Sequence, residues 1–260
     1  MDSESGWRVF LGPLLLLVVS YVIYQLRYPL WYSLKYVESI FVMLTLSYFA
    51  VFILALLLLK KDSKKSLSSV FKASGHSMVF AGIVFAVLYL GIWYLISFAT
   101  GSRFEFTSFP SLNGYDNYSV YLLPLAFALL LVFTVFGAFA EEVAYRGYVQ
   151  TRISSKYGLI VGIFTATLFF SLQHIHIFQL GWIENFFQTQ FVHVILFGIF
   201  VGYLFFKSKE NIWSVFSFHA LINIFNVSVP IVVTASFPFA SQLVDIPSFA
   251  IIILLVHYLL

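Results

Sequence analysis

The chain has 260 residues, of which 61% are hydrophobic and only 10% are charged, with a formal net charge of +3. Soluble globular domains carry about 25% charged and about 45–50% apolar residues, so one aqueous core could not bury this much apolar surface. The composition excludes an ordinary soluble domain and predicts that residues 1–260 form a single all-α, polytopic membrane domain. The small net charge, spread over short loops, argues against a nucleic-acid partner. Because the sequence contains no cysteine, disulfides and thiolate chemistry are excluded.

Apolar runs predict about eight transmembrane helices, with seven as the alternative, since a helix needs about 20 apolar residues to cross a bilayer. The first run has an acidic start and no small-residue cleavage site, so we expect a retained helix rather than a signal peptide. The last run is short and is expected to begin before Pro247 or to lie tilted. In chain order the predicted spans are Val9–Leu26, Ser39–Leu59, Met78–Thr100, Val120–Ala140, Leu159–Leu180, Phe186–Phe206, Ile212–Val233 and Ser248–Leu260.

The basic residues predict the orientation of these spans. With the basic loop of residues 60–77 inside, eleven of the 14 Lys and Arg residues fall in inner segments, and only Arg27, Lys35 and Arg103 fall in outer ones. Both termini are therefore expected in the cytoplasm, in a multi-pass protein of the cell membrane if the cell is prokaryotic. The basic loop either rests on anionic membrane lipid or is simply solvated.

The sequence EEVAYR directly follows an apolar run and places Glu141, Glu142 and Arg146 at its edge. Charged groups inside a membrane are costly and usually face a protein interior where they have partners and a function. Residues four apart share a helix face, so Glu142 can pair with Arg146. Glu141 points about 100° away and could face a cavity; the alternative is that Glu141 also pairs with Arg146.

Three further polar residues interrupt later apolar runs: His174, His219 and Asn223. Glu141 and His174 each lie roughly 24–26 Å along their helices from a turn expected near Tyr157–Gly158, so antiparallel packing brings them to one level. His219 and Asn223 share a helix face and match that level only if the hairpin projects into the cytoplasm. Phe170 lies four residues before His174 and can pack against its imidazole.

The ordered motifs EExxxR, FxxxH and HxxxN resemble those of the CPBP family, which contains the type II CAAX prenyl endopeptidases and bacteriocin-processing or self-immunity relatives. The resemblance covers about residues 120–233, the expected catalytic core spans. Gly198 and Gly202 fall where the family has a less defined motif, and their G-x-x-x-G spacing also suits plain helix packing. The motif residues are Glu141, Glu142, Arg146, Phe170, His174, His219 and Asn223.

The resemblance implies an intramembrane endopeptidase that opens to the cytoplasm and cleaves near the membrane end or C-terminus of a peptide, prenylated and of CAAX type in eukaryotic members. Carried over from the family, Glu141 and His174 activate a water molecule, while His219 and Asn223 stabilise the oxyanion. The remaining glutamate and the arginine of EExxxR then form a structural ion pair. This glutamate-type scheme needs no cofactor.

A metalloprotease is the alternative for the same residues. Glu141, His174 and His219 could bind zinc or another divalent metal with water in the open position. No HExxH motif is present in the sequence, so this reading is not favoured. His193 is either an extra ligand or a packed histidine, and His176 is expected at the outer interface.

Two other functions remain open from the sequence. A proton-coupled transporter could use Glu141 and the histidines as a relay, and a non-catalytic immunity or scaffold protein could retain the site as a relic. A serine protease is disfavoured, because Ser171, Ser217 and Ser228 are expected to satisfy helix backbones in lipid.

Overall fold

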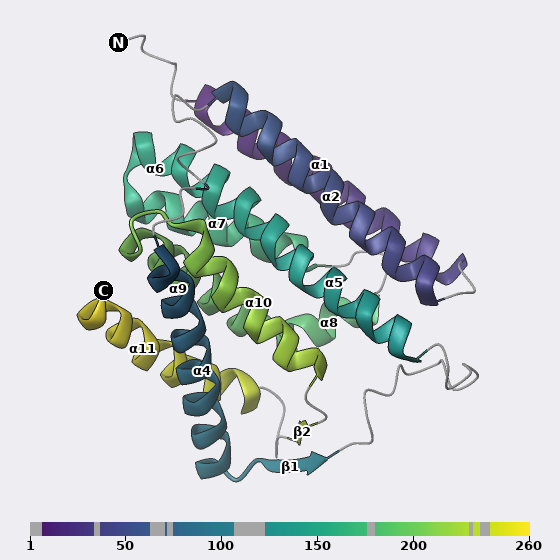
Figure 1. The fold of residues 1–260 in the computed structure, drawn as a ribbon, viewed down its shortest axis with the longest axis vertical. Helices are drawn as coiled ribbons and strands as arrows, with labels where there is room; N and C mark the ends of the chain where they lie inside the picture. The colour runs from purple at the N-terminus through teal and green to yellow at the C-terminus, as the bar shows by residue number, and fades with distance from the viewer. Residues whose placement is uncertain are drawn as a thin grey trace.

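The computed structural model describes residues 7–33, 37–62, 71, 75–106, 123–175, 180–228, 231–234 and 240–260. These residues form a helical bundle with one two-stranded ribbon (Figure 1), so the predicted all-α membrane bundle is confirmed with the ribbon as an addition. The elements are α1 (Arg8–Ser33), α2 (Val37–Asp62), α4 (Gly75–Ala99), β1 (Arg103–Phe106), α5 (Leu123–Glu142), η1 (Val143–Gln150), α6 (Thr151–Tyr157), α7 (Leu159–Gln173), α8 (Leu180–Thr189), α9 (Phe191–Lys207), α10 (Ile212–Ser228), β2 (Ile231–Thr234) and α11 (Ala240–Leu259).

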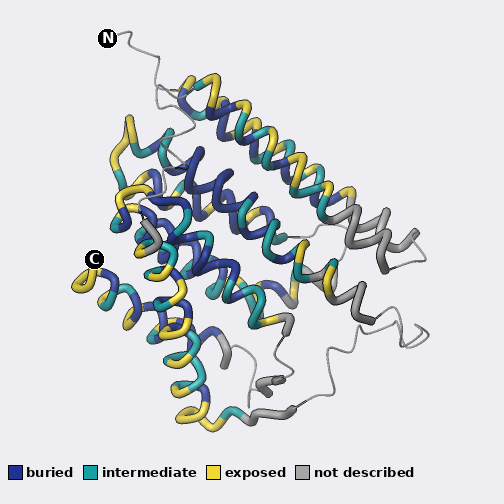
Figure 2. Tube along the Cα trace, viewed as in Figure 1, coloured by how far each residue is buried: buried dark blue, intermediate teal, exposed yellow. Residues whose placement is uncertain are grey.

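The outside of the bundle is apolar and its centre contains the polar groups. Side chains such as Leu11, Val18 and Val22 of α1 are exposed, whereas buried residues concentrate in the middle of the bundle (Figure 2). Three described helical stretches are long and apolar enough to cross a bilayer, namely Arg8–Leu26, Ser77–Ala99 and Gln242–Leu259. Shorter apolar helical stretches are Leu159–Gln173, Phe191–Lys207 and Ile212–Asn226. An apolar exterior around buried polar groups is the arrangement that a lipid solvent favours.

The fourth predicted span continues past its apolar run, as expected, to a turn at Gly158. This glycine has a φ of +88°, a backbone conformation that side chains with a Cβ rarely adopt. The segment between the span and this turn is not a plain α-helix, because Val143–Gln150 form the π-helical segment η1, in which every residue is buried. Thr151 at its end donates a side-chain hydrogen bond to the carbonyl of Arg146 at 3.0 Å. Such π segments are rare and often lie at functional sites.

The fifth and sixth predicted spans are wrong at their facing ends. Helix α7 ends at Gln173 rather than near Leu180, and Phe186 belongs to the separate short helix α8. The backbone turns between α8 and α9 at Gln190, which has φ −121° and ψ −23°.

The side chain of Gln242 on α11 explains why this break is tolerated. Its Nε2 donates to the carbonyl of Phe187 at 2.9 Å and also to that of Gln188, and its Oε1 accepts from the amide of Val192 at 3.3 Å. In lipid, backbone groups left without partners at a break cost several kcal/mol each. One amide side chain therefore satisfies both sides of the junction.

The seventh predicted span is also too long. Helix α10 ends at Ser228, and Ile231–Thr234 instead pair as β2 with β1 in antiparallel register, with Arg103 opposite Thr234. The sequence supplies a reason, since Pro230 disfavours helix in the residue before it. The last helix begins before Pro247, as predicted, at Ala240. His176 and most of the loop of residues 60–77 lie outside the described residues.

The two glycines of the G-x-x-x-G sequence allow α9 to pack closely on its neighbours. A Cβ atom at Gly198 would lie 2.7 Å from Cγ2 of Thr167 on α7. A Cβ atom at Gly202 would lie 2.9 Å from Oε1 of Gln150 on η1. Both glycine carbonyls then accept hydrogen bonds from η1, Gly198 from Arg146 at 3.3 Å and Gly202 from Gln150 at 2.9 Å.

We expect Gly198→Ala to lower the free energy of unfolding by about 1–3 kcal/mol, because overpacking a tight helix contact forces the backbones apart. Denaturant unfolding of the protein in mixed micelles would measure this change. Gly91→Ala in α4 is the matched control, since no atom lies within 4 Å of the added Cβ there. Equal losses for the two variants would show that α9 does not depend on close approach.

Candidate active site

The EExxxR residues lie where α5 passes into η1, at the centre of the bundle. Glu141 is 4% exposed, and Glu142 and Arg146 are fully buried. The ion pair expected from their spacing is present, with Nη1 of Arg146 3.2 Å from Oε1 of Glu142. The other end of the guanidinium donates to the carbonyl of Gly198. Arg146 therefore links the acidic end of α5 to the backbone of α9.

His219 lies between the two glutamates. Its Nδ1 is 2.7 Å from Oε1 of Glu142, and its Nε2 is 3.8 Å from Oε2 of Glu141. Oε1 of Glu142 thus contacts both Arg146 and His219. This carboxylate therefore orients the imidazole and also pairs with the guanidinium. The spacing within EExxxR could not reveal this second role, because His219 is 77 residues away in the chain.

Gln173 is a site residue that the sequence reasoning missed. Its Nε2 donates to Oε1 of Glu141 at 3.3 Å, and its Oε1 accepts a hydrogen bond from the hydroxyl of Tyr145. Tyr145 lies four residues after Glu141, and this i, i+4 spacing was the available signal. The hydrogen bonds from Tyr145 through Gln173 to Glu141 join Glu141 to α7. They show that Glu141 lies at the level of the end of α7.

His174 forms the C-terminal cap of α7 rather than a mid-helix residue. Its Nδ1 lies 2.8 Å from the carbonyl of Phe170. A carbonyl can only accept, so Nδ1 carries the proton and Nε2 has the acceptor lone pair in the neutral ring. The imidazole packs against the ring of Phe170, with ring centroids 4.6 Å apart.

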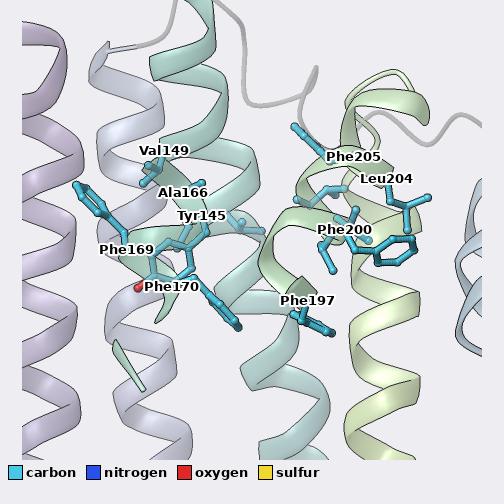
Figure 3. Close-up of a cluster of buried hydrophobic side chains, with 14 of the residues drawn as sticks. Tyr145, Val149, Ala166, Phe169, Phe170, Phe197, Phe200, Leu204 and Phe205 are labelled. Atoms are coloured by element: carbon cyan, nitrogen blue, oxygen red, sulfur yellow. The ribbon is translucent and has the colours of Figure 1, made fainter. Parts of the chain in front are cut away.

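Phe170 forms the hydrophobic centre of the site. Its ring centroid lies 4.9 Å from the guanidinium carbon of Arg146 and 6.1 Å from the imidazole of His219. Figure 3 shows Phe170 of α7 beside Tyr145 of η1, with Phe197 of α9 nearby. These rings exclude water from the ion pair and leave the histidines at the edge of the apolar cluster.

A cavity of about 390 Å³ lies against this group. His174, His219 and Asn223 all line it, so motif residues from α7 and α10 that lie far apart in the chain meet at one cavity. Glu141 is not among these lining residues; it connects to the cavity through His219, whose Nε2 lies 3.8 Å from its Oε2. The lining residues are Phe170, His174, Gln190, His193, Val194, Phe197, His219, Ile222, Asn223 and Asn226.

The cavity runs along α10 from His219 to Asn226, away from the Ile212 end of that helix. The basic residues predict that the Ile212 end faces the cytoplasm. The cavity therefore extends from the motif residues toward the opposite side of the bundle, and the expected cytoplasmic opening stays a prediction.

The serines and the possible metal ligands named from the sequence complete the description of the site. Ser171 donates to the carbonyl of Thr167, and Ser217 donates to those of Val79 and Ser214, which is the backbone role expected for them. Within the described part of the chain, no three His, Asp or Glu side chains form a group that could hold a metal ion.

A helical membrane protein with a buried Glu, Arg and His cluster beside a polar cavity is the class that the fold and the site define. Residues 123–225 match the family described as type II CAAX prenyl endopeptidase Rce1-like, and all the motif residues fall in this range. The chain is also 25% identical to CAAX prenyl protease 2 of Methanococcus maripaludis, over 80% of this chain and 79% of that relative. The resemblance expected from the motifs is thus confirmed.

We expect Arg146→Gln and Glu142→Gln each to destabilise the protein by about 3–5 kcal/mol, since either leaves a buried charge without its partner. The double variant should lose much less than the sum of the two, because it leaves neither charge. Denaturant unfolding in micelles would give the coupling energy of this double-mutant cycle. Glu184→Gln is the control: its exposed hydrogen bond to Gln188 should contribute under about 0.5 kcal/mol. Strict additivity of the two buried changes would contradict a coupled pair.

Proposed function

We propose that this protein is an intramembrane endopeptidase that hydrolyses a peptide bond near the C-terminus or membrane end of its substrate. Prenylated CAAX-type peptides are the substrate class that the family description and the relative's name suggest. The observation that carries the proposal is the position of His219, which joins Glu141 and Glu142 at the wall of a cavity that His174 and Asn223 also line. Peptide hydrolysis needs a base, oxyanion donors and space for water, and this arrangement supplies all three.

The charge balance of the cluster supports a division of roles. Two carboxylates, Glu141 and Glu142, face one guanidinium, and a net buried charge is costly. The cluster is neutral when it holds one further proton, which the 3.8 Å approach of Glu141 to His219 allows the two to share. Across this contact one of the two groups can accept a proton while the other donates.

In the proposed reaction, Glu141 and His174 take a proton from a water molecule, whose oxygen attacks the carbonyl carbon of the substrate. The resulting oxyanion accepts hydrogen bonds from His219 and Asn223. The intermediate collapses when the C–N bond breaks, and the leaving amine takes the proton that the base had accepted. The carbonyl of Phe170 fixes the tautomer of His174, which puts the acceptor lone pair of the neutral ring on Nε2.

The favoured scheme uses no metal. The alternative is a zinc or other divalent ion bound by Glu141, His174 and His219, in which the metal would activate the water molecule. Membrane lipid is the proposed partner of the apolar outer surface.

We expect Glu141→Gln to reduce cleavage of a fluorogenic farnesylated peptide by at least about a thousandfold, since the amide cannot accept the proton of water. Asn223→Ala should lower kcat by about 10²–10³, the usual effect of removing one oxyanion donor. Both rates would be measured on purified protein, with and without a chelator and with an unprenylated peptide in parallel.

Glu184→Gln, an exposed acid on α8, is the matched control and should keep full activity. Full cleavage by Glu141→Gln would contradict the proposed base. Activity that a chelator abolishes and zinc restores would support the metalloprotease, whereas altered ion flux in vesicles without any cleavage would support a carrier.

We further propose a cytoplasmic location for the hairpin between α6 and α7. The sequence has no cysteine, so single cysteines report position without background. Ser155→Cys, exposed on α6, should react with an impermeant maleimide only from the cytoplasmic side, and Thr100→Cys, exposed at the end of α4, only from the outside. The reverse labelling pattern would invert the orientation.

A further inference from the structure

A second acid–histidine pair lies on the same cavity, outside the family motifs. His193 of α9 lines the cavity, and its Nδ1 lies 3.1 Å from Oδ1 of Asp245 on α11. Asp245 is only 2% exposed, whereas the His193 side chain is 32% exposed. The pair therefore has a buried acidic end and an imidazole that reaches the cavity.

Two more donors converge on Asp245. The hydroxyl of Tyr89 lies 3.2 Å and Nε1 of Trp93 lies 3.0 Å from Oδ1, both from α4. A buried carboxylate needs hydrogen-bond donors around it, and these two side chains supply them. Among the described residues, His193 is the ion-pair partner of Asp245. The pair is neutral only when His193 is an imidazolium.

The orientation of His193 lets its second ring nitrogen contact a ligand in the cavity. With Nδ1 held by Asp245, Nε2 is the nitrogen left for the cavity, and in the imidazolium it is a donor. The lining residues include no Lys or Arg. An anionic group that enters this cavity therefore has His193 as its natural charged partner away from the two glutamates.

The distance to the reaction centre limits what that anion can be. The ring of Phe197 lies 6.1 Å from His193 and 4.8 Å from His219, so the two imidazoles are at most about 11 Å apart. Three extended peptide residues span roughly 10–11 Å. A peptide bond beside His219 would thus place a free carboxylate three residues later within reach of His193.

We propose that His193, positioned by Asp245, binds the C-terminal carboxylate of the peptide substrate. This inference rests on the proposed endopeptidase function and adds the side chain that would recognise the free carboxylate of such a substrate. Asp245 is then a positioning residue that acts through His193.

The test compares two substrates that differ only at their end: a farnesylated peptide with cysteine followed by three residues and a free carboxylate, and the same peptide as its C-terminal amide. Wild-type protein should prefer the acid. His193→Gln should lower kcat/KM for the acid by about tenfold to a hundredfold, the contribution of one charge-assisted hydrogen bond, and leave the amide unchanged. Asp245→Asn should reduce the same preference.

His257→Gln is the matched control, because His257 is an exposed histidine on the same helix as Asp245 and contacts Tyr203 instead of the cavity. The acid-to-amide ratio is internal to each variant, so partial loss of folded protein does not affect it. Equal cleavage of acid and amide by wild-type protein, or an equal loss of both in His193→Gln, would overturn the carboxylate site and leave the endopeptidase intact. Cleavage of neither peptide by wild-type protein would overturn both.

Discussion

One buried oxygen, Oε1 of Glu142, is the point on which the described structure depends. It accepts from Arg146 and from His219, and Arg146 in turn donates to the backbone of α9 at Gly198. A single carboxylate thereby ties the end of α5 to α9 and α10. A buried ion pair adds little stability over well-packed apolar side chains. Its effect here is geometric, since it fixes the position and the ring orientation of His219 beside Glu141.

Three glutamine side chains make further polar links between elements inside the apolar bundle. Gln150 donates to Gly202, Gln173 joins Tyr145 to Glu141, and Gln242 satisfies the junction between α8 and α9. Each amide offers both a donor and an acceptor, so it can bridge two elements without bringing a charge into lipid. Uncharged glutamine side chains thus make many of the polar links between the helices around the few ionised groups.

Composition and spacing were enough to predict the helical membrane bundle, the turn at Gly158, the Glu142–Arg146 pair and the meeting of His174 with His219 and Asn223 at one cavity. Hydropathy could not show the break between α8 and α9, because the side chain that satisfies it, Gln242, comes from a helix about fifty residues later in the chain. The π segment escaped prediction for a similar reason: it is stabilised by packing and not by a local pattern. Gln173 and Asp245 were missed because their partners come from other helices, and a single sequence does not reveal such pairings.

The role of α11 has a consequence for biosynthesis. This helix is translated after α8 and α9, yet its Gln242 closes their junction and its Asp245 holds His193. The three sequence motifs are therefore synthesised before the side chains that hold His193 and the α8–α9 junction in place. Completion of the site is in this sense coupled to the docking of α11, and a nascent chain that carries every motif does not yet have its supporting contacts.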